Sequence, residues 1–238
     1  MYENHLQEDV FNSKLINSKF KMDMKNNLSP CDYVWKARDN QPKPLTKEQF
    51  LSFLNGMDVK MTTEKVRLHD AQSEVYKIQL PAVTWQARFG GKLRNDANAQ
   101  PTGMFCLDVD IHHEPEFKDI LTANGKEAAI AWAEQEARER AERWARDAKM
   151  SSDLWPGGQP DDHDLDILGI HISPSGTGVH VIACCNYSCN TIAENQARLA
   201  RLLGTSYDAV CKDWARIFFL TPREDWTYLD LDNIFGYE

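Results

Sequence analysis

The sequence contains no long apolar run, and its first residues do not have the pattern of a secretory leader. No stretch approaches the roughly twenty apolar residues that a membrane-spanning helix needs. The N-terminal stretch MYENHLQEDV lacks the basic segment followed by an apolar segment that marks a secretory signal peptide. These two absences argue against a membrane span or a membrane partner, and they predict a cytoplasmic protein.

The sequence also lacks cysteine pairs with the spacing of a metal-binding or redox motif. The chain has six cysteines, but none is spaced as CxxC and most lie in apolar, strand-like stretches. We therefore expect buried thiols rather than disulfides. The segment CCNYSC at 184–189 has no second cluster to complete a tetrahedral site, which argues against structural zinc.

Positive charge is scarce, because 27 Lys and Arg residues face 36 Asp and Glu residues and the formal net charge is −9. A protein that coats nucleic acid by bulk electrostatics needs a basic face, so this class is disfavoured. A local basic groove remains open. Its candidates lie in or near the stretch QARFGGKLR, where an exposed edge strand and turn is an equally good explanation: Lys77, Arg88, Lys92 and Arg94.

Apolar residues make up 42% of the 238 residues, which is enough for one large domain or a core with an appended unit. Residues 1–45 are polar with mixed charges and predict a weakly ordered N-terminal arm. Helical spacing begins at Thr46, in LTKEQFLSFLNG, and the alternating stretch EVYKIQLPAVTWQARF predicts strands broken at Pro81. We expect a single domain over 46–238, in which a small α+β unit at 46–102 precedes the main body.

The order of elements in the main body, residues 103–226, predicts an RRM-like α+β core. The predicted elements are a strand MFCLDVDI, a helix over 116–149, strands LGIHI and GVHVIACC joined by the turn SPSGT, a helix between Thr191 and Gly204, and a strand ARIFFL. This βαββαβ order is typical of a ferredoxin-like antiparallel sheet with both helices on one face. In that topology the first strand lies centrally, between GVHVI and ARIFFL.

Strand alternation assigns the side chains of the first strand to two faces. Phe105 and its alternate neighbours should face the helices, which leaves Asp108 and Asp110 on the open face, beside His180 of the neighbouring strand. Two carboxylates there are costly unless a cation offsets them. Mg²⁺ and Mn²⁺ bind carboxylates and also accept phosphate oxygens, so the pair suits a nucleoside triphosphate site.

A D-x-D pair by itself is a weak signal. The second such pair in the chain, in YLDLDN at 228–233, is interpreted as exposed surface. The acidic loop DDHDLD at 161–166 is also interpreted as solvent-exposed, with a loosely held cation left open.

The turn between the two middle strands could hold phosphates. Ser173 and Ser175 offer hydroxyl donors, and Gly176 and Gly178 allow backbone N–H groups to approach an anion closely. His180 could donate to the same phosphates. Taken singly, the turn reads as an ordinary hairpin and the histidine as a half-buried side chain. Their combination with two aspartates on the adjacent strand favours a nucleotide site.

These motifs resemble the archaeo-eukaryotic primase superfamily, which carries an acidic D-x-D strand, an S-x-H element and a further acid. LPAVTW, FCLDVDI, SPSGTGVHV and YDAVCKDWARIFFL resemble in particular the primase-like domain that precedes VirE-type helicase regions in bacterial mobile-element replication proteins. The similarity covers about residues 46–226.

The resemblance implies Asp108 and Asp110 as metal ligands, Ser175, Gly178 and His180 as phosphate contacts, and Arg216 as a partner of phosphate or of the acidic cluster. The third acid departs from the family pattern, because TPRED follows FFL; the candidates are Asp225, Glu224 and Asp213. The implied activity is two-metal transfer of nucleotides onto a 3′-hydroxyl with Mg²⁺ or Mn²⁺. The implied partners are nucleoside triphosphates, a single-stranded nucleic-acid template and a replicative helicase.

Two alternatives stay open. A degenerate core could bind nucleotide or single-stranded nucleic acid without catalysis, which the net acidity and the unsettled third carboxylate favour. A metal-dependent phosphohydrolase could use the same aspartate pair. The sequence does not choose between RNA and DNA synthesis.

Overall fold

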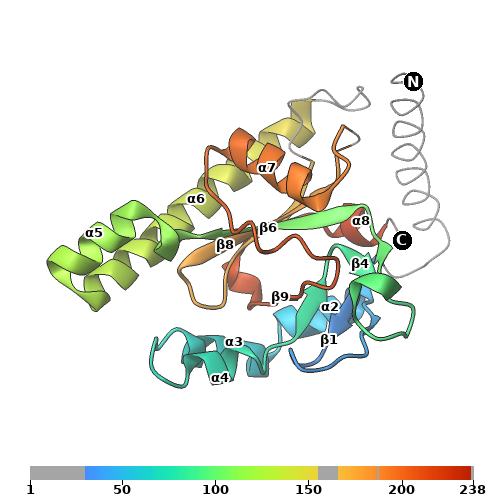
Figure 1. Cartoon of the computed structure of the whole chain (residues 1–238), viewed down its shortest axis with the longest axis horizontal. Coiled ribbons are helices and arrows are strands. Elements are labelled where there is room, and N and C mark those ends of the chain that lie inside the picture. Colours follow the sequence, from blue (N-terminus) through green and yellow to red (C-terminus); the bar gives the residue numbers. More distant parts are fainter. Residues whose placement is uncertain (1–29, 155–165, 187, 237–238) are drawn as a thin grey trace.

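The chain folds as a mixed α+β protein around two antiparallel four-stranded sheets (Figure 1). The computed structural model describes residues 30–154, 166–186 and 188–236. Most of the predicted N-terminal arm and of the acidic loop DDHDLD therefore lies outside the described residues. Among the described helices, none is both long enough and apolar enough to cross a bilayer.

The first sheet gathers short strands that lie far apart in the sequence. Its order is β2 (Lys43–Pro44), β1 (Asp32–Val34), β3 (Ala82–Thr84) and β9 (Phe218–Phe219). Three helices accompany it: α2 (Lys47–Leu54), α3 (Met57–Val66) and α4 (Ser73–Lys77). Helix α2 begins as predicted, because the Thr46 hydroxyl accepts the Gln49 N–H and the Gln49 side chain accepts the Thr46 N–H.

Two predictions about this unit are corrected. Residues 30–45 are not a loose lead-in, because the buried strand β1 pairs with β3. The alternating stretch predicted to form strands broken at Pro81 begins as helix α4, and only its part after Pro81 forms strands, with residues 82–84 in β3 and residues 87–88 in β4. The side chains of α4 are at most half-buried, so their alternation did not reflect burial on a sheet.

The second sheet carries the predicted D-x-D strand. Its order is β10 (Trp226–Leu229), β7 (Ile167–Ile172), β8 (Gly178–Cys184) and β6 (Met104–Asp110). The neighbouring position of β6 and β8 is confirmed. The prediction that β6 is central is wrong: it is an edge strand among the described residues, the ARIFFL segment supplies β9 of the other sheet, and β10 joins the opposite edge. The specific RRM-like strand order is therefore not observed.

The outer edge of β6 is covered by the chain that leads to β9. The Asp208 N–H donates to the Asp108 carbonyl at 2.8 Å, and the Gln196 amide donates to the Cys106 carbonyl at 3.0 Å. These contacts satisfy backbone carbonyl groups of β6 that would otherwise pair with a further strand on this edge.

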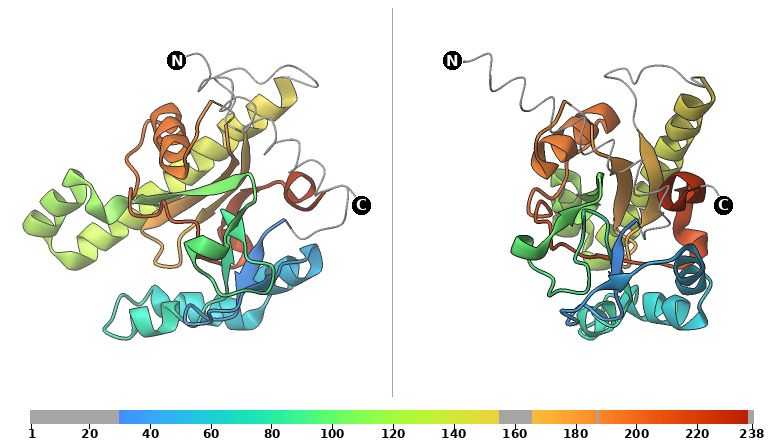
Figure 2. Two further views of the ribbon diagram at one scale, coloured as in Figure 1. Left: turned by 45° about the vertical axis from the view of Figure 1, so that its right-hand side comes forward. Right: turned by 90° about the vertical axis from the view of Figure 1, so that its right-hand side faces the viewer.

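Helices cover one face of the second sheet, as predicted. α6 (Lys126–Leu154) and α7 (Ile192–Leu203) lie on that side, and α5 (Pro115–Asn124) extends beyond it (Figures 1 and 2). The predicted single helix over 116–149 is two helices, because Gly125 has a φ of +87° between them. The buried residues of this face include members of β6, β8 and the alanine stripe of α6: Phe105, Leu107, Val109, Val179, Val181, Ala133, Ala137 and Ala141.

The other face of the second sheet is not bare. Cys106 and Ile182, which alternate with the residues of the helical face, pack against side chains of the first unit, including Val83 and Trp85. The first sheet and its helices thus cover part of this face, and the end of β6 that carries Asp108 and Asp110 is left half-buried. The remaining described elements are β4 (Ala87–Arg88), β5 (Gln100–Pro101), α8 (Leu231–Phe235) and the 3₁₀ turns η1 (Asp96–Asn98), η2 (Ile111–His113) and η3 (Arg223–Asp225).

Candidate functional site

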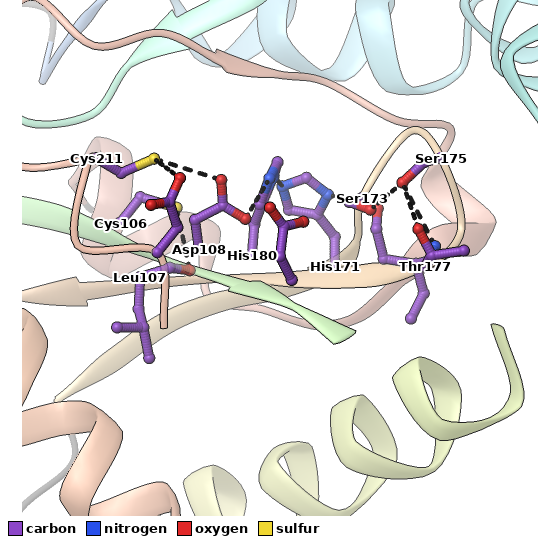
Figure 3. Close-up of polar contacts among 12 residues, drawn as sticks. Cys106, Leu107, Asp108, His171, Ser173, Ser175, Thr177, His180 and Cys211 are labelled. Carbon is purple, nitrogen blue, oxygen red and sulfur yellow. Dashed lines mark hydrogen bonds and ion pairs between the residues drawn. The ribbon is translucent and has the colours of Figure 1, made fainter. Parts of the chain in front are cut away.

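The register between β6 and β8 creates the centre of the site. Asp108 lies directly opposite His180, and Asp110 lies directly opposite Gly178. Figure 3 shows Leu107 pointing to the helical side of the strand and Asp108 pointing to the other. The Asp108 Oδ1 and His180 Nε2 atoms are 3.5 Å apart. The pairing therefore brings a carboxylate pair, an imidazole and the start of the Ser/Gly turn onto one surface.

A second histidine, which sequence reasoning missed, holds His180 in place. His171 Nδ1 lies 3.0 Å from the Ile172 carbonyl, and His171 Nε2 lies 3.3 Å from His180 Nδ1 (Figure 3). The same Nδ1 also lies 3.0 Å from the Thr221 hydroxyl, so His171 links Ile172 and Thr221 on one side to His180 on the other. The other ring nitrogen of His180, Nε2, is directed to Asp108. Burial keeps the pKa of His171 well below its usual value, so this ring is neutral.

The two aspartates differ in their protonation behaviour. Burial raises the pKa of Asp108, but the charge and hydrogen bond of His180 outweigh it, and the pKa lies below its ordinary value. The pKa of Asp110 is raised, first by burial and then by the nearby charge of Asp108. A half-buried pair with this mutual repulsion is an environment that a cation stabilises.

The 173–178 turn joins the site through its hydroxyl groups. The Oγ atoms of Ser173 and Ser175 are 3.0 Å apart, and Ser175 Oγ is 3.0 Å from the Thr177 hydroxyl (Figure 3). The expected backbone nest is partly used by the turn itself, because the Gly176 N–H donates to the Ser173 carbonyl at 2.9 Å. Gly176 has a φ of +81°, which favours glycine. The hydroxyl groups of Ser173, Ser175 and Thr177, here called the hydroxyl row, are therefore the hydrogen-bond donors that the turn can offer to a ligand.

Two cations near the site complement the carboxylates. Arg67, at the end of α3, donates to the Ser173 carbonyl at 3.3 Å, and its Nε has no hydrogen-bond partner among the described residues. Lys77, one of the predicted basic cluster, is close enough to lower the pKa of Asp108 electrostatically. Nothing in the sequence around Arg67 signalled this role, because only the tertiary packing of α3 brings it to the turn.

The predicted third acids all have other partners. Asp225 is buried and its Oδ2 accepts from Arg67 at 2.9 Å. Glu224 pairs with Lys60 at 2.8 Å, and Asp213 pairs with Arg216 at 3.1 Å. Among the described residues, none of the three joins a group of potential metal ligands with Asp108 or Asp110.

A different carboxylate lies beside Asp108. The ligand atoms of Asp108, Asp208 and Cys211 lie within 4.8 Å of one another. The Cys211 thiol is 3.5 Å from the carboxylates of both aspartates, and burial raises its pKa, so it stays protonated and donates to them. Asp208 lies in the segment YDAVCKDWARIFFL, which carries part of the primase resemblance. The sequence therefore contained this carboxylate, but the prediction of a third acid named Asp213, Glu224 and Asp225 instead.

The other predicted basic residues have structural partners. Arg216 donates to the Val210 carbonyl at 2.9 Å and pairs with Asp213, so it holds the segment that carries Asp208. Arg94 donates to the carbonyls of Ala215 and Ala37. Of the four residues proposed as a basic groove, Lys77 acts electrostatically on Asp108.

No protein-family model, curated protein or solved structure matches this chain. The primase resemblance therefore stays a prediction that depends on the motifs themselves. The site itself combines carboxylate, hydroxyl and cationic groups on one surface.

Replacing Arg67 with Met should destabilise the protein by about 2 kcal/mol at neutral pH. Removing one partner of a fully buried ion pair costs roughly 3–5 kcal/mol, and the partial exposure of Arg67 reduces that figure. Burial raises the pKa of Asp225, and Arg67 opposes this rise, so the variant has a still higher pKa at Asp225. The folded variant binds a proton more readily than the unfolded chain, and the destabilisation should shrink as the pH falls.

Urea denaturation at about pH 7 and about pH 5 measures this effect. Lys60→Met is the matched control, because it breaks the exposed pair with the neighbouring Glu224 and should cost clearly less than the Arg67 substitution. A loss in R67M no larger than in K60M, or a loss that grows on acidification, would contradict the role of Arg67.

Proposed function

We propose that this protein is a metal-dependent nucleotidyltransferase of the primase-polymerase type, which adds nucleotides to a 3′-hydroxyl on a single-stranded template. The observation that carries the proposal is the register of β6 and β8, with Asp108 opposite His180 and Asp110 opposite Gly178. This register places a carboxylate pair next to a turn with three hydroxyl groups. Cation and phosphate ligands thus occur side by side.

The residues present fit a divalent cation. Asp108 and Asp208 belong to one group of potential ligand atoms and Asp110 belongs to a second, and their carboxylates are hard oxygen donors that suit Mg²⁺ and Mn²⁺. When bound, the ion would act as a Lewis acid toward a 3′-hydroxyl and offset the charge of the leaving pyrophosphate. Asp208 replaces Asp225 in this proposal as the third carboxylate, because its side chain shares the Cys211 thiol with Asp108.

The protein's own groups would position the triphosphate. The hydroxyls of Ser173 and Ser175 can donate to phosphate oxygens, and Arg67 and Lys77 supply positive charge on the same side. His180, held by His171, directs Nε2 to the space next to Asp108 and can hold a proton there. These groups bind and orient a substrate, which is the main task in phosphoryl and nucleotidyl transfer.

The second candidate is a module that binds nucleotide or single-stranded nucleic acid without catalysis. The observation that favours it is the burial of the turn: Ser173, Gly176 and Gly178 are buried, and Gly176 lies against Glu134 and Arg67. A nucleotide would have to approach through the hydroxyl row and the half-buried aspartates. The net charge of −9 also limits nucleic-acid binding to a local surface.

Primer synthesis tests the proposal directly. The protein is incubated with a single-stranded DNA template, labelled ribo- or deoxyribonucleoside triphosphates and Mn²⁺ or Mg²⁺, and the products are separated by length. Metal-dependent chain extension supports the nucleotidyltransferase. Nucleotide binding without product supports the binding module, and release of phosphate without extension supports a phosphohydrolase. Absence of both binding and product contradicts a nucleotide site.

A further inference from the structure

A second group of potential metal ligands lies at the end of β6, where the strand continues directly into the 3₁₀ turn η2, Ile111–His113. A 3₁₀ helix has three residues per turn, so side chains at i and i+3 lie above one another. Asp110 and His113 stand in that relation, with His112 next to them. One ligand atom each from Asp110, His112 and His113 falls within a common 4.8 Å.

The distances in this group suit a shared ion better than hydrogen bonds. His112 Nδ1 is 3.7 Å from Asp110 Oδ1, and His113 Nδ1 is 4.0 Å from Asp110 Oδ2. Both separations exceed the usual hydrogen-bond length. Two ligand atoms that bind one ion at about 2.1 Å are roughly 3–4 Å apart. The Nδ1 atoms of both rings already face the carboxylate, and the ring centroids are 4.1 Å apart.

The group is open to solvent on the histidine side and anchored on the aspartate side. The side chains of His112 and His113 are 43% and 65% exposed, whereas that of Asp110 is 25% exposed. His112 also makes an edge contact with the Phe117 ring of α5. An ion could therefore enter from solvent, and small rotations of two accessible rings would close the remaining distance.

We propose that Asp110, His112 and His113 bind a divalent transition-metal ion through one carboxylate and two imidazoles. Imidazole ligands favour first-row transition ions such as Zn²⁺, Fe²⁺ and Ni²⁺ over Mg²⁺, which prefers oxygen and retains its water, and Mn²⁺ is a paramagnetic member of this series that serves as the probe. The site shares Asp110 with the proposed nucleotidyltransferase centre but does not require nucleotide. It predicts that the metal at the Asp110 end of that centre belongs to the transition series.

Mn²⁺ titration followed by calorimetry and pulsed EPR tests the inference on the full chain without nucleotide. Protein-bound Mn²⁺ should show coupling to directly bound ¹⁴N, and Mg²⁺ should bind more weakly than Mn²⁺. Loss of supporting groups around a metal costs 10–100-fold in affinity, so loss of two direct ligands in H112A/H113A should weaken Mn²⁺ binding at least about tenfold. The nitrogen coupling should disappear in the same variant.

Two controls keep this result separate from the proposed function. His69→Asn removes a histidine that pairs with Glu134 outside the group and keeps a residue that tolerates its positive φ, so Mn²⁺ binding should not change. Asp108→Asn should lose nucleotide transfer but keep the nitrogen-coupled Mn²⁺. Nitrogen coupling that persists in H112A/H113A, or equal affinity for Mg²⁺ and Mn²⁺, would overturn the inference.

Discussion

Asp108→Asn should abolish metal-dependent nucleotide transfer while leaving the protein folded. The side chain contacts His180 on one side and the Cys211 thiol on the other, next to the carboxylate of Asp208. Asparagine keeps the shape but removes the negative charge that a divalent ion needs. Because loss of groups that merely support a metal ligand costs 10–100-fold, loss of this ligand should lower the rate of primer extension by more than about a hundredfold.

The fold should change little in this variant, because the backbone of residue 108 keeps its pairing with β8 and Asn can still accept one hydrogen bond. We expect a stability change within about 1 kcal/mol. Asp213→Asn is the matched control: the Asp213 side chain is exposed and forms an ion pair with Arg216, and the variant should retain full activity. Full activity in D108N, or equal losses in both variants, would refute the assignment of Asp108.

Gly178→Ala should impair both stability and activity. A Cβ at this position would lie 2.8 Å from the Val109 carbonyl oxygen, 3.2 Å from Ser173 Oγ and 3.3 Å from Asp110 Oδ1. The first contact is with backbone, so β6 and β8 must separate where Asp110 pairs with residue 178. Overpacking of this kind costs about 1–3 kcal/mol. A displacement of the carboxylate near 1 Å can cost about a hundredfold in rate, so we expect a loss between about tenfold and a hundredfold.

Thermal denaturation and primer extension measure the two effects. Gly91→Ala controls for adding a methyl group to a glycine: nothing lies within 4 Å of its Cβ, and its φ of +77° causes only local strain of order 1 kcal/mol. G91A should keep its activity. An active G178A, or one no less stable than G91A, would show that the strand contact at the site is looser than described.

The parts of the site that lie on β6 and β8 were predictable from the sequence. A strand alternates its side chains with a period of two, so the apolar residues around Asp108 fixed which face each neighbour occupies. The helical side and the position of His180 next to Asp108 follow from that pattern together with the turn SPSGT. The N-cap of α7 was equally local, because Thr191 accepts the Glu194 N–H.

Other features depend on contacts between distant segments, which the pattern does not encode. The ARIFFL stretch is a good strand in either sheet, and only its pairing with β3 assigns it to the first. Because this stretch does not pair with β6, the segment between α7 and β9 lies along the edge of β6 instead. This segment brings Asp208 and Cys211 next to Asp108. The ion pair between Arg67 and Asp225 likewise depends on tertiary packing, and it gives a different partner to the residue that the sequence suggested as a third metal ligand.

The sequence by itself determined that Asp108, Asp110 and His180 share one face of the sheet, because strand periodicity is a local property of the backbone. It also determined the turn chemistry beside His180, because Ser and Gly act there through their own hydroxyls and backbone freedom. Only the tertiary structure decided the strand order, the position of Asp208 beside Asp108 and the position of Arg67 at the turn. Those depend on which segments bury apolar surface together, and burial is a property of the whole chain rather than of any one stretch.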